Sequence, residues 1–114
     1  MALPTYFRKS GDVSPIIQAT LTRPEESGAV DINGASGVTI YAKDASGTLE
    51  LNGAAASLTG DGTDGEVEYS PSAGDFDVEG EYKVEWEVDW DGAGDVERFP
   101  KKDYQIVHVS AELA

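Results

Sequence analysis

The most regular segment of this chain reads Glu81-Tyr82-Lys83-Val84-Glu85-Trp86-Glu87-Val88-Asp89-Trp90-Asp91. Apolar or aromatic and charged residues alternate through it without a break, which is the pattern of a half-buried antiparallel strand. The alternation assigns one face of the strand to the structural core of the domain: Tyr82, Val84, Trp86 and Val88. Trp90 shares that face, but it stands at the end of the strand, where its ring can join an interface.

Shorter alternating runs extend in both directions from this segment. Turn-forming residues separate them at intervals of about 8 to 12 residues, a spacing typical of a β-sandwich. We expect strands over residues 16–22, 30–32, 38–43, 48–51, 66–69, 96–100 and 104–109. Turn residues bracket residues 54–58 too closely for a stable helix. The sequence therefore predicts a single all-β domain, an antiparallel sandwich.

The charge of the chain narrows the choice of partner. It has 114 residues, with 22 acidic and 8 basic side chains, and a formal net charge of −14. Nucleic acid and anionic membrane surfaces bind clustered Lys and Arg, so we expect neither as a partner. Such a charge repels itself in dilute buffer, and salt screens the repulsion. The composition resembles that of proteins from salt-loving organisms, and an acidic protein of a mesophile is the alternative.

The sequence contains no cysteine and no long apolar segment, and both features bear on where the protein is made. The chain has no cysteine, which excludes a disulfide or a catalytic thiolate. It shows neither the apolar core of a signal peptide nor a run of about 18 apolar residues. We therefore expect a protein made in the cytoplasm of its host, without a transmembrane helix.

No arrangement of residues predicts catalysis. His108 is the only histidine, and no serine or cysteine motif accompanies it, which argues against a catalytic triad. No motif selects a pair among the many carboxylates, and no glycine run matches a phosphate-binding loop. We therefore expect no enzymatic activity and no cofactor. The nearest approach to a metal site is Asp61, Asp64 and Glu66 on a glycine-rich loop, but their spacing differs from that of an EF-hand.

Three groups of residues together resemble a known family. They are Arg8-Lys9-Ser10-Gly11-Asp12 before the strand over 16–21, Val30-Asp31-Ile32-Asn33-Gly34-Ala35 before the strand over 38–44, and the series Gly65-Glu66-Val67-Glu68-Tyr69, Gly80-Glu81-Tyr82-Lys83-Val84-Glu85-Trp86-Glu87-Val88 and Arg98-Phe99-Pro100. In this order, over about residues 6–109, they resemble the immunoglobulin-like N-terminal domain of baseplate upper proteins of tailed viruses and its small free-standing relatives. The chain departs from the family in its longer segment over residues 51–65 and in ending at Ala114, where those proteins continue into a region that binds receptor-binding proteins.

The resemblance implies an immunoglobulin-like sandwich that serves as a structural protein of the virion. It would dock to other virion proteins and to copies of itself, and its place stays open among baseplate, tail, neck and capsid decoration or turret. In such a sandwich we expect Tyr82 to form a tyrosine corner, with its hydroxyl bonded to a backbone group within residues 75–78.

The expected docking residues are apolar and aromatic. Residues 1–7 form an uncharged N-terminal arm ahead of a sandwich over residues 8–114, and the arm offers Leu3, Tyr6 and Phe7 to a neighbour. Phe7 fits the first strand of the sandwich equally well. Tyr41 and Trp90 complete the protein-binding candidates. The alternative function is a module that binds a carbohydrate or receptor on the host surface, through the same two aromatic rings.

Overall fold

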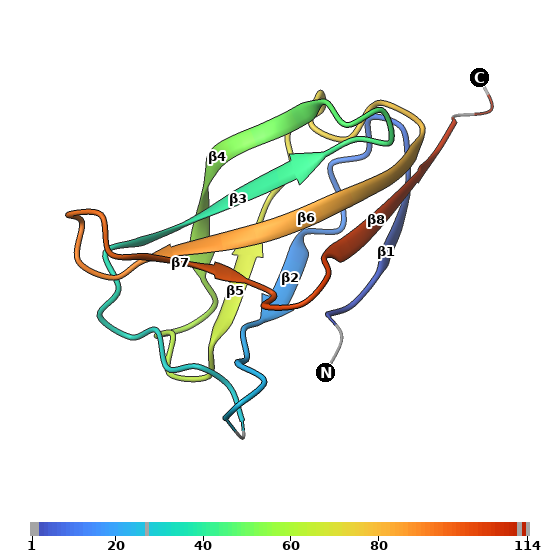
Figure 1. The fold of residues 1–114 in the computed structure, drawn as a ribbon. Coiled ribbons are helices and arrows are strands. Elements are labelled where there is room, and N and C mark those ends of the chain that lie inside the picture. Colours follow the sequence, from blue (N-terminus) through green and yellow to red (C-terminus); the bar gives the residue numbers. More distant parts are fainter. Residues whose placement is uncertain (1–2, 27, 112, 114) are drawn as a thin grey trace.

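The computed structural model describes residues 3–26, 28–111 and 113. The described residues form eight strands and no helix, which confirms the all-β fold (Figure 1). The strands are β1 (Tyr6–Lys9), β2 (Ile17–Thr20), β3 (Gly37–Lys43), β4 (Leu49–Leu58), β5 (Glu66–Tyr69), β6 (Gly80–Asp89), β7 (Val96–Phe99) and β8 (Gln105–Ser110). Within these ranges of the chain, no helix is present that is long and apolar enough to cross a membrane.

The strands pair in the order β1-β8-β6-β3-β4-β5-β2, and β7 pairs with β6. β4 belongs to both layers of the sandwich, because residues 49–56 pair with β3 whereas Ser57 and Leu58 pair with β5. In Figure 1, β3 and β6 cross in front of β5 and β2. β2 ends the order on one side, so one edge of this strand has no strand beside it.

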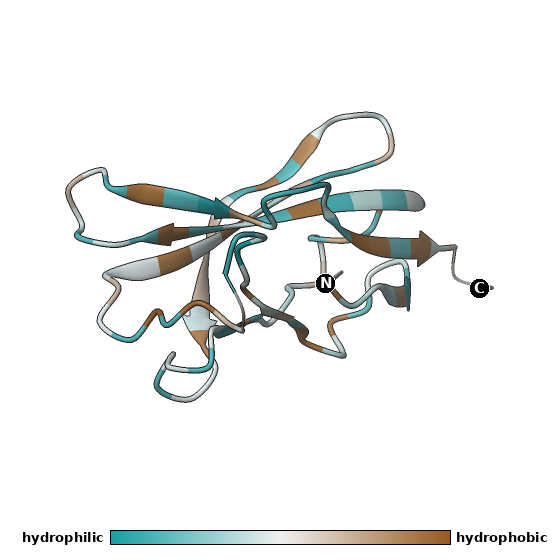
Figure 2. Ribbon diagram, turned by 60° about the horizontal axis from the view of Figure 1, so that its bottom comes forward, coloured by the Kyte–Doolittle hydropathy of each residue, from teal (hydrophilic) through white to brown (hydrophobic). Residues whose placement is uncertain are grey.

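β6 is the central strand of the larger layer. One of its edges pairs with β3, and the other pairs first with β8 and then with β7. The four residues expected in the core, Tyr82, Val84, Trp86 and Val88, are fully buried. Burial of each such side chain contributes roughly 1.5–3 kcal/mol. Brown and teal positions alternate along the strands in Figure 2, as the sequence pattern indicates.

Tyr82 forms the expected tyrosine corner. Its hydroxyl oxygen accepts a 3.0 Å hydrogen bond from the backbone N–H of Val78. Its ring packs edge-to-face against Phe76, with 4.9 Å between the ring centroids. The segment before β6 is therefore fastened to the core at the point where the strand begins.

The N-terminal strand begins inside the expected arm and pairs in an unexpected direction. β1 begins at Tyr6, so Tyr6 and Phe7 belong to the first strand of the sandwich, which was the alternative to their place in an arm over residues 1–7. In addition, β1 pairs parallel to β8, with Tyr6 opposite Val107, in a sheet expected to be antiparallel. A parallel pair requires a long connection between its strands, and the remainder of the domain supplies it here. Met1 and Ala2 of the expected arm lie outside the described residues.

Two further segments differ from the strand pattern. Residues 30–32 were expected to form a strand, but beside them only an isolated bridge forms, between Thr22 and Ala29. Val30 and Ile32 are nevertheless buried in the core. β4 continues through the segment around Ala54, well beyond the strand expected over residues 48–51.

Candidate docking surfaces

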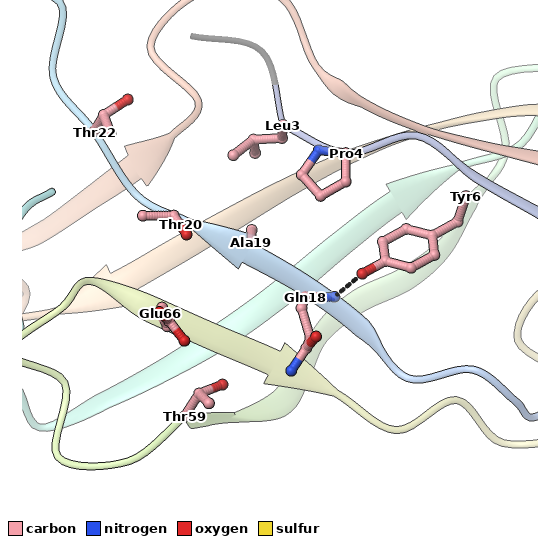
Figure 3. A pocket seen from close by; sticks show the side chains of 9 residues that line it. All are labelled: Leu3, Pro4, Tyr6, Gln18, Ala19, Thr20, Thr22, Thr59 and Glu66. Atoms are coloured by element: carbon pink, nitrogen blue, oxygen red, sulfur yellow. Dashed lines mark hydrogen bonds between the residues drawn. The ribbon is translucent and has the colours of Figure 1, made fainter. Parts of the chain in front are cut away.

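A hollow of about 300 Å³ lies beside the open edge of β2 (Figure 3). We call it the edge hollow. It is lined mainly by Leu3, Pro4 and Tyr6 on the N-terminal side and by Gln18, Thr20 and Thr22 on the other.

Side-chain hydrogen bonds hold the N-terminal segment beside β2. The Tyr6 hydroxyl accepts a 3.0 Å bond from the backbone N–H of Gln18, drawn in Figure 3. The buried side-chain amide of Gln105 donates 3.0 Å bonds to the carbonyls of Pro4 and Gln18. These side chains bond the backbone N–H and C=O of Gln18, which a neighbouring strand would otherwise pair with.

The edge is more open at Thr20. Backbone groups of a paired strand alternate in direction, so Thr20 presents its N–H and C=O to the same side as Gln18. The Thr20 side chain is exposed, and β2 contains neither a charged residue nor a proline. Such an edge is a template for pairing with another chain.

The expected arm residues are divided between the core and the surface. Leu3 and Tyr6 are partly buried against the core of their own domain. Phe7 is 74% exposed and stacks on the ring of His108, with the centroids 5.0 Å apart. Of the three, Phe7 alone offers most of its surface to a partner.

A second hollow, of about 470 Å³, lies on the face of β3 and β6 that points away from the core. We call it the outer hollow. Its polar lining includes Tyr41, Lys43, Asn52, Lys83, Arg98 and Tyr104. The period of two within residues 38–43 and 81–91 predicts Tyr41, Lys43 and Lys83 on this face, but it does not indicate that they gather with Arg98 and Tyr104.

Tyr41 is engaged by its neighbours. The guanidinium of Arg98 lies over the Tyr41 ring, 4.0 Å from its centroid, and is held there by Glu87 at 2.7 Å. The ring crosses Gly53, where an added Cβ would approach the Tyr41 hydroxyl to 3.2 Å. One face of the Tyr41 ring is therefore covered by a cation, which weakens its candidacy as a stacking surface for a sugar.

Trp90 is half-buried and is also engaged. Its indole N–H donates a 3.2 Å hydrogen bond to Glu97. The carboxylate of Glu97 also accepts two 2.8 Å bonds from Arg23 and lies 2.8 Å from the ammonium of Lys101. The bonds from Arg23, more than those from Lys101 and Trp90, lower the pKa of Glu97 to about 2. This ion-pair cluster joins β7 to the loop after β2, and the hydrogen bond from Trp90 ties that ring to it.

In the glycine-rich loop considered as a cation site, the carboxylate of Asp61 bonds groups of the loop itself. Oδ1 of Asp61 accepts hydrogen bonds from the backbone N–H and the hydroxyl of Thr63, at 3.0 and 2.7 Å. These bonds hold the pKa of Asp61 below its ordinary value. Asp61, Asp64 and Glu66 do not gather into a metal-binding group, and no other described residues do so.

No protein-family model matches the chain, and no curated protein matches it. Function is therefore inferred from the two hollows and from the resemblance of residues 6–109 to baseplate upper proteins.

Proposed function

We propose that this protein is a docking module that acts through protein–protein contacts, as a structural component of a tailed-virus particle whose host lives in high salt. The open edge of β2 at the edge hollow carries the proposal. An extended segment of a partner would pair with the backbone at Thr20 and bury its own side chains against Leu3 and Tyr6, a mode of recognition known as β-augmentation.

The sequence of β2 supports this role. Edge strands that are not used for binding are commonly blocked by a lysine, a proline or a bulge. β2 reads Ile17-Gln18-Ala19-Thr20 and pairs with β5 in an unbroken register. Side chains of Tyr6 and Gln105 cover the backbone of Gln18, so Thr20 is the open part of this edge. An open backbone position without a blocking residue suits a surface that is covered in an assembly.

The assignment to a virus particle rests on the resemblance of residues 6–109 to baseplate upper proteins. Tyr82, in the resembling segment over residues 80–88, has a structural role in the fold as a tyrosine corner. Contact with copies of the chain or with other virion proteins would then place it at repeated positions set by the symmetry of the particle. The high net charge supports a salt-rich setting.

Copy number in purified particles tests the proposal. Mass spectrometry should detect the chain at a stoichiometry fixed by particle symmetry, and its absence from particles would overturn the proposal. Thr20→Lys adds a blocking charge at the open edge and should lower that copy number. The matched control is Ser46→Lys, which adds the same charge at an exposed turn on another part of the domain. A full copy number for Thr20→Lys would remove the edge of β2 from the docking surface.

A further inference from the structure

Lys43 and Lys83 face each other across the pairing of β3 and β6, at the outer hollow. Like charges directly opposite on neighbouring strands are destabilising. Both residues are exposed, and neither has an ion-pair partner among the described residues. This is an unusual arrangement in a chain with 22 acidic and 8 basic residues, where a carboxylate would be the expected neighbour.

The remaining polar groups of the outer hollow, apart from Glu85, can all donate hydrogen bonds. Arg98, the hydroxyls of Tyr41 and Tyr104, and the amide of Asn52 line it together with the two lysines. The only carboxylate in the lining is that of Glu85, which lies 3.3 Å from Arg98. The two lysines therefore carry the positive charge that is left uncompensated, because Arg98 is paired with Glu85 and Glu87. This charge, beside groups that can donate hydrogen bonds, favours a negatively charged ligand that accepts them, and a carboxylate has both properties.

Carboxylates of the required kind are displayed at the end of the β6–β7 hairpin. The loop from Asp91 to Asp95 is exposed along its whole length, and the hairpin extends away from the rest of the domain in Figure 1. Asp91 uses Oδ1 to accept hydrogen bonds from the backbone N–H groups of Ala93 and Asp95, which fixes the loop. Neither Asp91 nor Asp95 forms an ion pair with a described residue.

We propose that the outer hollow binds the Asp91–Asp95 hairpin tip of a second copy of this chain. The proposal rests on the proposed docking function and names one of its partners. A single copy cannot make this contact. The tip lies beyond Asp89, the last residue of β6, and Asp89 is six residues from Lys83 on the same strand, roughly 20 Å at 3.3 Å per residue. Opposite charges held apart on one rigid sheet are complementary only between molecules.

The contact is head-to-tail. The hollow of one copy receives the tip of the next, while its own tip remains free for another hollow. Contacts of this type close into rings or continue as filaments. General repulsion between copies acts beyond direct contact and is screened within roughly 8 Å at 0.15 M salt, so the contact is to be measured at that salt concentration or above.

Two complementary variants test the proposal. Lys43→Glu with Lys83→Glu removes the receiving hollow, and Asp91→Asn with Asp95→Asn removes the charge of the tip while Asn keeps the capping oxygen. In sedimentation velocity from roughly 10 μM to 1 mM, the wild-type chain should self-associate and each variant alone should do so about tenfold more weakly or not at all. A mixture of the two should form a one-to-one dimer that does not grow, because one intact hollow meets one intact tip.

The matched control is Lys9→Glu with Lys102→Glu, which changes the net charge equally at exposed lysines outside the outer hollow. It should associate like the wild type. A wild-type chain that stays monomeric, a hollow variant that associates as well as the control, or a mixture that forms no dimer would each overturn the proposal. None of these outcomes bears on the edge of β2, whose role is decided by copy number in particles.

Discussion

The indole N–H of Trp86 donates a 2.7 Å hydrogen bond to the side-chain oxygen of Gln105, and both residues are fully buried. The amide nitrogen of the same glutamine holds the carbonyls of Pro4 and Gln18. One buried side chain therefore connects the central strand, the N-terminal segment and the open edge strand. The geometry of the edge hollow depends on this connection.

Gln105→Met should lower the free energy of unfolding by about 2–4 kcal/mol. Methionine has a similar volume, but it leaves the Trp86 N–H without its acceptor in the core, and each unsatisfied buried group costs about 1–3 kcal/mol. Urea unfolding measures the loss. The matched control is Gln18→Met, the same substitution at an exposed position. Equal effects at the two positions would show that the buried network contributes nothing specific.

Tyr82→Phe should lower the free energy of unfolding by about 1 kcal/mol, the net value of a typical hydrogen bond. The variant keeps the buried ring and loses only the bond to the N–H of Val78. A thermal melt should show a midpoint lower by roughly 4 °C for a domain of this size. Tyr104→Phe, at a side chain that is 46% exposed, should melt like the wild type. An unchanged midpoint for Tyr82→Phe would contradict the stabilising role of the tyrosine corner.

Local alternation was sufficient to predict the core face of most strands. Ile17 and Ala19 in β2, and Val38 and Ile40 in β3, are buried as the period of two indicates. This succeeds because a strand buried on one face must place its apolar residues at every second position. The same period of two predicts the burial of Trp86 and of the other core-facing residues of β6.

Contacts between distant segments could not be predicted in this way. The sequence placed Lys43 and Lys83 on outer faces, but their direct opposition depends on the register between β3 and β6. Gln105 looked like an ordinary residue of the last strand, although it bonds Pro4 at the other end of the chain. Pairing and register are set by tertiary packing and turn geometry, which periodicity within one strand does not encode.

Stability should fall in acid as Glu97 is protonated. Its pKa is lowered from an ordinary value of 4.5 to about 2, first by the hydrogen bonds from Arg23. A carboxyl whose pKa is lower in the folded than in the unfolded protein stabilises the fold fully at any pH above its pKa in the unfolded chain. This stabilisation is lost as the pH falls from about 4.5 towards 2. The shift corresponds to at most about 3 kcal/mol, and partly exposed pairs contribute less.

Urea unfolding at a series of pH values, comparing wild type with Glu97→Gln, measures this contribution. The stability difference between the two should be largest near neutral pH and should shrink below about pH 4. Glu66→Gln, at an exposed carboxyl outside the ion-pair cluster, is the control and should follow the wild type. A difference that stays constant across the acid range would contradict the pairing of Glu97 with Arg23.

Thermal stability should rise with salt. Between Asp61 and Glu97 the only basic residue is Lys83, so carboxylates repel one another over a large part of the surface. The screening length falls from roughly 10 Å at 0.1 M to roughly 3 Å at 1 M salt, and the melting temperature should increase over that range. Salt also strengthens apolar burial, and a charge variant is needed to separate the two effects.

The variant Asp64→Asn, Glu79→Gln, Asp77→Asn removes three exposed carboxylates that lie outside the hairpin tip and form no ion pair with a described residue. It should melt higher than the wild type at 0.1 M salt and approach it at 1 M, because the relief of repulsion is already present in the variant. The contribution of apolar burial is the same in both proteins and cancels in the comparison. Parallel salt curves for the two proteins would show that repulsion among the acids is negligible, and a wild-type melting temperature that stays flat or falls from 0.1 M upward would remove the salt-adapted interpretation of the composition.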